Sequence, residues 1–204
     1  MDKVKHWNKV FEEKDTTKVS WYQATPYLSV ALVTKYLPNL KGSVIDIGGG
    51  DSSLPNSLLA LNYEDISLLD ISSEAIQRNQ YSLAAESSQV DWINADVTQW
   101  VPERKYNLWF DRAVFHFLNE EADQLAYKRK ALAGIEIGGY LIIGAFSKNG
   151  GPTKCSGIEV AQQDKASISQ IFDEGFEWVE NFEMEHETPS GSSQMFNWSV
   201  LIRV

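Results

Sequence analysis

The chain has 204 residues, of which 43% are hydrophobic and 23% charged, and its formal net charge is −10. This length and composition predict one globular domain with a sizeable core. The negative charge argues against nonspecific binding to nucleic-acid phosphates and against docking on an anionic membrane. No signal peptide or membrane-spanning run is present, and a single cysteine, Cys155, excludes an intrachain disulfide. We therefore expect a soluble cytoplasmic protein.

The first 25 residues are unusually aromatic for a terminus. Trp7, Phe11, Trp21 and Tyr22 flank a polar stretch that runs from residue 12 to 18. Two interpretations are open at this point. The rings cover an exposed end of the core, or they form a lid over a ligand.

From residue 26 onward, helical and extended segments alternate. The patterns predict helices at about 26–37, 53–61, 72–85 and 121–133, and strands at 43–47, 66–70, 90–93, 106–110 and 140–146. This alternation indicates right-handed βαβ units and a mostly parallel sheet. After a polar loop at 147–156, the sequence predicts a helix at 165–172. Two extended segments, 176–185 and 194–204, should pair antiparallel at the sheet edge.

The glycine-rich stretch Val44-Ile45-Asp46-Ile47-Gly48-Gly49-Gly50-Asp51-Ser52-Ser53 reads as strand, tight turn and helix start. Glycine allows positive φ and close approach of a ligand to the backbone, and the helix start offers free N–H groups. Open α/β sheets bind ligands at this end of a strand. Nicotinamide dinucleotides and S-adenosylmethionine are the two cofactor classes that compete for such a loop.

The details of the loop separate these two cofactors. The dinucleotide pattern G-x-G-x-x-G is met by Gly48 and Gly50, but Ser53 stands in the third place. The Asp46 carboxylate would be poorly placed beside a pyrophosphate. It would suit the ammonium and sulfonium groups of S-adenosylmethionine, because opposite charges attract strongly in a semi-buried cleft.

Acids recur at successive strand ends, at Asp46, Asp70, Asp96 and Asp111. Asp70 lies twenty residues after Gly50, where a carboxylate can accept both ribose hydroxyls. Asp96 and the neighbouring Val97 would suit the amine and the ring of an adenine. A single strand-end acid is often a turn or cap residue, but four in succession favour a binding site.

The ordered motifs Val44–Gly50, Leu69-Asp70-Ile71-Ser72, Asn94-Ala95-Asp96-Val97 and Gly138–Ile143 together resemble the class I S-adenosylmethionine-dependent methyltransferases. The resemblance implies a doubly wound α/β fold whose seven-stranded sheet has the order 3-2-1-4-5-7-6, with strand 7 antiparallel. It implies a lid at 1–25, a cofactor-binding core at 26–146, and an acceptor-side loop and hairpin at 147–204. The implied cofactor-binding residues are Trp7, Phe11, Trp21, Asp46, Gly48, Gly49, Gly50, Asp70, Ile71, Asp96, Val97 and Asp111.

Three front-end motifs, His6-Trp7-Asn8, Val19–Gln23 and Asp111–Leu118, resemble one branch of small methyltransferases. That branch contains bacterial proteins of unassigned substrate and eukaryotic protein-lysine methyltransferases. The resemblance implies that the aromatic residues lie over the cofactor and that Arg112 lines it.

The chemistry implied is in-line displacement at the sulfonium methyl, so the enzyme mainly positions the nucleophile and excludes water. The candidate catalytic residues are His116, Asp111 and Arg112. His116 follows the fourth strand and is either a proton-transfer group or a histidine bonded to backbone. Asp111 and Arg112 would form an ion pair that shapes the site or serves structure alone. We expect His186 to lie on the surface.

The leading function is transfer of a methyl group to a small molecule or a protein side chain. The alternatives are a nicotinamide-dependent oxidoreductase and a noncatalytic cofactor-binding module. No histidine or cysteine cluster has zinc-ligand spacing, so no metal is expected. The segment 148–157 should border the acceptor, because loops around a rigid site often select the substrate.

Overall fold

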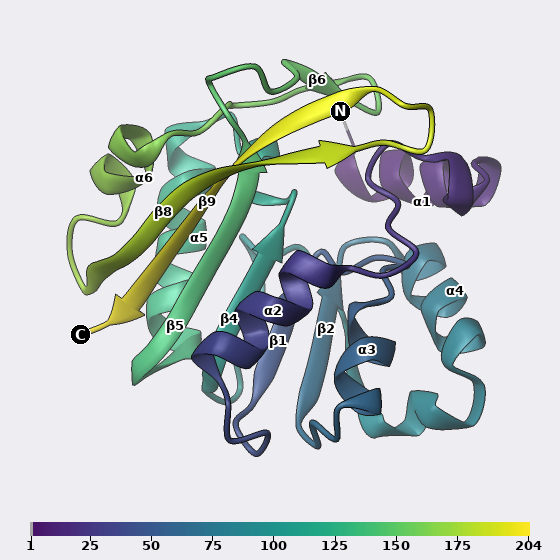
Figure 1. The fold of residues 1–204 in the computed structure, drawn as a ribbon, viewed down its shortest axis with the longest axis horizontal. Helices are drawn as coiled ribbons and strands as arrows, with labels where there is room; N and C mark the ends of the chain where they lie inside the picture. The colour runs from purple at the N-terminus through teal and green to yellow at the C-terminus, as the bar shows by residue number, and fades with distance from the viewer. Residues whose placement is uncertain (1) are drawn as a thin grey trace.

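Continuous apolar runs form the centre of a seven-stranded sheet in the computed structural model, which describes residues 2–204 (Figure 1). Every residue of β1 and β2 is buried, as expected for strands covered on both faces. The strands of this sheet are β1 (Val44–Ile47), β2 (Ile66–Asp70), β3 (Val90–Asn94), β4 (Tyr106–Arg112), β5 (Ile135–Phe146), β8 (Phe176–Glu187) and β9 (Ser193–Arg203).

The strand order is β3-β2-β1-β4-β5-β9-β8. The first five strands are mutually parallel, and β9 runs antiparallel to both β5 and β8. With β8 and β9 as the sixth and seventh strands, this is the predicted order with the predicted antiparallel strand. The expected fold class is confirmed.

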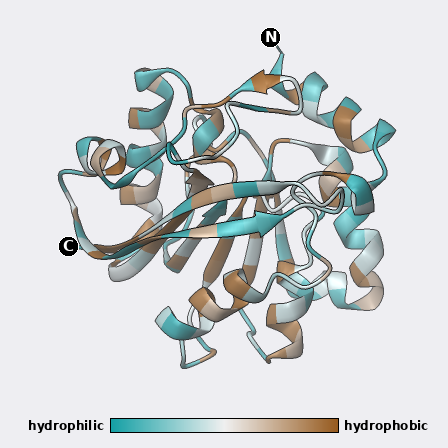
Figure 2. Ribbon diagram, turned by 45° about the horizontal axis from the view of Figure 1, so that its top comes forward, coloured by the Kyte–Doolittle hydropathy of each residue, from teal (hydrophilic) through white to brown (hydrophobic). Residues whose placement is uncertain are grey.

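Helices cover both faces of the sheet. One hydrophobic cluster packs α2 (Tyr27–Tyr36), α3 (Leu54–Ala60) and α4 (Ser73–Leu83) on one face. A second cluster packs α5 (Glu121–Gly134) and α6 (Lys165–Ile171) on the other. Figure 2 shows hydrophobic residues concentrated in the central strands between these layers. Within residues 2–204, no helix combines the length and apolar character needed to cross a bilayer.

The N-terminal segment forms a helix, α1 (Lys3–Glu13), that the sequence patterns did not predict. Two contacts place it across the carboxyl ends of the strands. Ser72 Oγ, at the start of α4, donates to Asn8 Oδ1 over 2.8 Å, and Lys3 Nζ pairs with Asp123 of α5 at 2.9 Å. The helix therefore bridges the helical layers on both faces.

Several short elements refine the predicted boundaries. The described part of the chain, residues 2–204, contains the 3₁₀ turns η1 (Thr16–Lys18), η2 (Ala84–Gln89) and η3 (Phe115–Phe117). The expected loop at 147–156 contains β6 (Lys154–Cys155), which pairs with β7 (Ile158–Glu159). The two residues between these strands, Ser156 and Gly157, both have positive φ, as a tight hairpin turn requires.

Candidate active site

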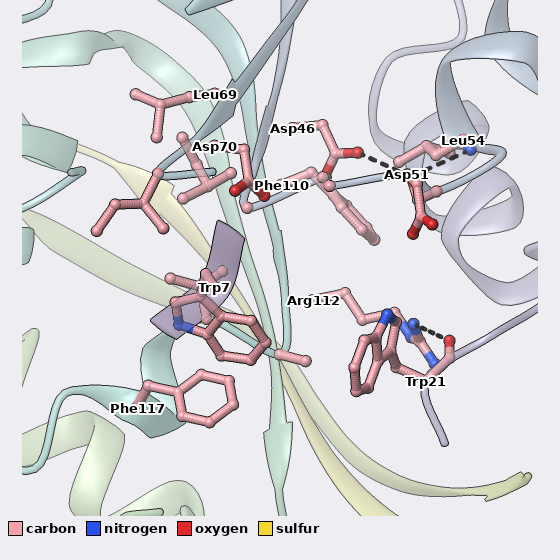
Figure 3. A pocket seen from close by; sticks show the side chains of 18 of the residues that line it. Trp7, Trp21, Asp46, Asp51, Leu54, Leu69, Asp70, Phe110, Arg112 and Phe117 are labelled. Carbon is pink, nitrogen blue, oxygen red and sulfur yellow. Dashed lines mark hydrogen bonds between the residues drawn. The ribbon is translucent and has the colours of Figure 1, made fainter. Parts of the chain in front are cut away.

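A cavity opens at the carboxyl ends of β1, β2 and β4, beneath α1 (Figure 3). Its volume is about 170 Å³. One water molecule needs roughly 10–15 Å³ on this measure, so the cavity can hold a ligand of many atoms. Strand ends supply its carboxylates, and α1 and the segment after it supply much of its aromatic wall.

The glycine loop keeps its backbone close to the cavity. Gly48 and Gly50 have φ of +63° and +54°, a region that favours glycine. A Cβ at Gly48 would overlap the side chain of Val114. A Cβ at Gly50 would lie 3.1 Å from Phe11 Cζ and 3.5 Å from Asp70 Oδ2. The loop can therefore line a ligand site only without side chains at these positions.

Two buried carboxyl groups face the cavity from neighbouring strands (Figure 3). Asp46 Oδ2 accepts a hydrogen bond from Ser52 Oγ at 3.3 Å, and Asp70 Oδ1 accepts one from the Ser72 N–H at 2.7 Å. Burial raises the pKa of Asp46 to about 8 and that of Asp70 to about 7. A ligand that brings a positive charge or hydroxyl donors would stabilise both carboxylates.

Another part of the cavity lies at the end of β3. Asp96 Oδ1 accepts from the N–H and the hydroxyl of Thr98 at 2.8 and 2.7 Å. Val97 is buried, and it lines the cavity together with Ile71 and Asp96. This arrangement offers an apolar surface beside a carboxylate, which suits a ring that carries an amine.

The last residue of β4, Arg112, contributes a cation to the opposite end. Its Nη1 donates to the Trp21 carbonyl at 3.0 Å, and its guanidinium lies 5.4 Å from the centre of the Phe196 ring. Nη2 is buried without a hydrogen-bond partner. Burial lowers the pKa of Arg112 to about 10, and the Asp46 charge opposes that shift, so the side chain stays charged at neutral pH.

Asp111 faces away from Arg112, because successive residues of a strand point to opposite faces. Its carboxylate is fully buried and accepts from Tyr127 Oη at 2.7 Å and from the Val114 N–H at 2.9 Å. Among residues 2–204, no ion pair joins it to Arg112, and it does not line the cavity. The expected ion pair is absent, and Asp111 instead holds the turn after β4.

His116 is also outside the cavity lining. Its ring is fully buried and stacks on Phe146 at 4.3 Å, and its Nδ1 accepts from the Phe146 N–H at 3.2 Å. Burial and the nearby Arg112 charge lower the pKa of His116 to about 3. These contacts favour the interpretation of a backbone-bonded histidine over that of a proton-transfer group.

The aromatic N-terminal residues cover the cavity rather than a bare end of the core. The rings of Trp7, Phe11 and Trp21 all line it, with centroids of Trp7 and Trp21 6.2 Å apart. The covering segment, residues 19–23, is also held by a hydrogen bond from β8. His186 Nε2 donates to the Ser20 carbonyl at 2.8 Å. His186, expected at the surface, is half-buried on β8 and is tied to the covering segment by this bond.

Other lining residues carried no signal in the sequence. Phe146, Phe196 and Phe117 come from β5, β9 and the turn after β4. Each reads as an ordinary core residue until the sheet brings it to the cavity. Cys155 also lines the cavity, so the segment 148–157 does border the site, and burial raises the pKa of its thiol. Across residues 2–204, no group of metal-binding side chains is assembled.

Comparison with known proteins gives this geometry a context. The family model described as the methyltransferase small domain matches residues 25–159. The chain belongs to this family.

Curated relatives of this methyltransferase include the "eEF1A lysine and N-terminal methyltransferase" of Mus musculus and of Homo sapiens. The mouse protein is 23% identical over 84% of this chain, and the human protein is 26% identical over 85%. The chain spans about a quarter of the length of each, 24% in both cases.

Solved structures share the methyltransferase fold. N-methyltransferase NodS from Bradyrhizobium japonicum, in complex with S-adenosylhomocysteine, has a TM-score of 0.72 at 14% identity and covers 96% of this chain and 97% of its own. The 1,6-didemethyltoxoflavin-N1-methyltransferase of Burkholderia thailandensis has a TM-score of 0.71 at 13% identity, covering 98% and 84%. Family and fold together identify S-adenosylmethionine as the methyl donor of this enzyme class.

The residues of the cavity fit this donor. A Cβ at Gly48 or Gly49 would overlap a neighbouring side chain. The buried carboxyl groups of Asp46 and Asp70 would be stabilised by a cation or by hydroxyl donors. The residues that line the cavity include no cluster of cations that could bind a pyrophosphate. Asp46, Asp70, Asp96 and the loop from Gly48 to Gly50 would therefore hold it.

Proposed function

We propose that this protein transfers the methyl group of S-adenosylmethionine to a small molecule that enters beside Arg112. In this proposal Asp70 accepts the ribose hydroxyls, and Asp96 with Val97 and Ile71 receives the adenine. Asp46 and the glycine loop hold the amino-acid end. The observation that carries it is the pair of buried, cavity-facing carboxyl groups of Asp46 and Asp70 on either side of a loop where a Cβ has no space.

The bound donor supplies an activated methyl group on a sulfonium. The side chains of this protein would then act by placement. Trp7, Phe11 and Trp21 exclude water and present aromatic faces that stabilise a cation. Asp111 positions the turn after β4 through its bonds to Tyr127 and Val114. No proton-transfer group is assigned, and an acceptor that is a neutral amine, thiolate or carboxylate needs little base catalysis.

The choice of a small acceptor rests on how the cavity is covered. Trp7, Trp21 and Tyr22 of the N-terminal segment line it, and so do Phe146, Cys155 and Phe196 of β5, β6 and β9. A protein side chain would have to enter past this cover. The lack of nonspecific nucleic-acid binding is a further proposal, supported by the net charge of −10. A cytoplasmic location is also proposed, supported by the single cysteine, which fits a reducing compartment.

Titration calorimetry with S-adenosylmethionine, S-adenosylhomocysteine and NAD tests the proposed cofactor. We expect binding of the two sulfur compounds and no heat with NAD. Binding of NAD alone would contradict the proposal. Transfer of labelled methyl groups into cell lysate, separated by size, then tests the acceptor, and label should enter the metabolite fraction. Label only in proteins would refute a small acceptor, and label in neither fraction would favour a noncatalytic module.

A further inference from the structure

The two ends of the cavity differ in charge. The carboxylates that line it, Asp46, Asp51, Asp70 and Asp96, lie at β1, β2, β3 and the glycine loop. The strands β4, β5, β6 and β9 contribute one charged residue to the lining, Arg112. The other lining residues from these strands are Phe110, Phe146, Cys155 and Phe196. The end that the proposed function gives to the acceptor is therefore apolar with one fixed cation.

The Arg112 guanidinium has an N–H group without a hydrogen-bond partner at this end of the cavity. A guanidinium carries five N–H donors in a planar fork. Nη1 is engaged with the Trp21 carbonyl at 3.0 Å, whereas Nη2 is buried and has no partner. A buried charged donor without a partner is costly, so the structure keeps a place that an acceptor atom would fill favourably.

The groups around Arg112 do not supply that atom. Asp46 of β1 is one charged neighbour, and it acts on the pKa of Arg112. His116 and His186 are the others, and burial together with the Arg112 charge lowers the pKa of each. The Phe196 ring covers the guanidinium at 5.4 Å. Besides Asp46, the charge thus has aromatic and imidazole rings as neighbours.

We propose that Arg112 binds a carboxylate of the methyl acceptor, whose apolar or aromatic body lies against Phe196 and Phe146. This inference rests on the proposed function, since it needs a methyl donor in the other half of the cavity. A guanidinium pairs with carboxylates through two parallel N–H bonds, which gives both affinity and orientation. A protonated lysine would be repelled at the same place, so the acceptor class differs from that in the names of the eEF1A relatives.

A carboxylate could also come from the amino-acid end of the donor, and the experiment separates the two sources. Calorimetry on protein saturated with S-adenosylhomocysteine would compare benzoate, benzamide and benzamidine, which have similar shapes and charges of −1, 0 and +1. The variants are Arg112→Met, which removes the charge, and Arg112→Lys, which keeps it. Arg129→Met, at an exposed position on α5, is the matched control.

We expect the wild type to bind benzoate about tenfold or more tightly than benzamide, and benzamidine least, because a bond to a charged group is worth about that much. Arg112→Met should abolish this ranking, Arg112→Lys should retain part of it, and Arg129→Met should leave it intact. A wild type that binds all three probes equally, or prefers benzamidine, would overturn the proposal.

A second titration identifies the donor as the source. 5′-Methylthioadenosine lacks the amino-acid group of S-adenosylhomocysteine. If Arg112→Met weakens S-adenosylhomocysteine at least tenfold, leaves 5′-methylthioadenosine unchanged, and no probe ranking exists, Arg112 serves the donor and the acceptor proposal is refuted. Equal weakening of all ligands would show that Arg112 only holds the Trp21 segment, which also refutes it. If the wild type binds no S-adenosylhomocysteine at all, the proposed function itself has failed.

Discussion

Asp70 illustrates how one residue links the sequence to the site. An acid that ends a buried strand cannot enter the core, so it turns to the cavity at the strand's carboxyl end. There it is buried, lines the cavity and accepts a hydrogen bond from the Ser72 N–H at 2.7 Å. The sequence predicted this placement because strand ends and acids are both readable from local pattern.

Replacing Asp70 tests its proposed role as the ribose acceptor. Asp70→Ala should weaken S-adenosylhomocysteine binding by about 1–3 kcal/mol through loss of two charged hydrogen bonds. Asp70→Asn keeps an oxygen for Ser72 and should lose less. Calorimetry measures both, with Asp173→Ala, at an exposed salt bridge to Lys128, as control. Unchanged affinity in a folded Asp70→Ala protein would remove the assignment.

Gly50 allows a test of the loop's shape at one atom. Gly50→Ala forces a Cβ into positive φ, at ~1–2 kcal/mol, and toward Phe11 Cζ at 3.1 Å. Gly150→Ala is the matched control, because Gly150 has φ of +88° but nothing within 4 Å of the added Cβ. Both variants should lower the melting temperature, whereas only Gly50→Ala should also weaken S-adenosylhomocysteine. Equal ligand affinities in the two variants would show that the contact with Phe11 is dispensable.

At the scale of elements, the covering segment 19–23 is fastened by three parts of the chain that are remote in sequence. Arg112 holds the Trp21 carbonyl at 3.0 Å, His186 holds that of Ser20 at 2.8 Å, and Ser53 Oγ donates to the Gln23 carbonyl at 3.1 Å. These partners come from β4, β8 and the residue before α3. The cover is thus tied to backbone carbonyls, which any sequence in the segment would offer.

His186→Ala should loosen this cover without touching the cavity. One lost hydrogen bond is worth ~0.5–1.5 kcal/mol, so the dissociation rate of S-adenosylhomocysteine should rise about two- to tenfold. Stopped-flow tryptophan fluorescence can follow it, since Trp7 and Trp21 line the site. Glu187→Ala, at the exposed next residue, should leave the rate unchanged. A similar rise in both variants would point to a general loosening of the β8–β9 hairpin.

Elements differed in how well the sequence predicted them. The five parallel strands are rich in apolar residues and have clear stops, and their order and direction are confirmed. Helix α1 was not predicted, although Val4, Trp7, Val10 and Phe11 recur at helical spacing and the Asp2 side chain caps its start. Its aromatic face packs on residues distant in sequence, such as Phe117 at 5.1 Å from Trp7. The β6–β7 hairpin was missed although the Ser156-Gly157 pair is a turn signal.

At the scale of the whole molecule, buried carboxyl groups, two lining the cavity and one beside it, make stability depend on pH. Asp46, Asp70 and Asp111 have pKa values raised by burial to about 8, 7 and 6. An acid with a raised pKa in the folded state contributes stability that is complete below its unfolded value, ~3.9, and is lost as pH rises through the folded value. The fold therefore accepts a penalty at neutral pH to keep carboxylates in the site.

Asp46→Asn isolates one of these groups. The melting temperature of the variant minus that of the wild type should increase between pH 5 and pH 8, by ~2–4 °C for each ~1 kcal/mol of wild-type stability lost. Asp173→Asn should show no such trend there, because the Lys128 bond lowers the pKa of Asp173 and its stability contribution changes only at lower pH. Scanning calorimetry without ligand measures both. A flat difference for Asp46→Asn would mean that Asp46 is ionised and well solvated.

The site as a whole was only partly predictable. The donor side is built from residues next to strand ends, and sequence order places them. The acceptor side depends on which face of β4 Arg112 occupies and on Phe196, 84 residues later. No local pattern in the sequence links two such distant positions. The expected ion pair of Asp111 and Arg112 was wrong for another reason, because adjacent residues of a strand point to opposite faces. The cofactor roles and the single-domain organisation stay predictions.

The position of Cys155 has a practical consequence. It is the one cysteine in the 204-residue sequence, and it lines the cavity from the β6–β7 hairpin. A library of disulfide-forming fragments would therefore attach at one known place, and the fragments retained would report the shapes and charges that this end of the cavity accepts. Because burial raises the pKa of this thiol, such a screen should run at mildly alkaline pH. Covalent fragment screening at Cys155 would therefore show which chemical groups the proposed acceptor end of the cavity binds.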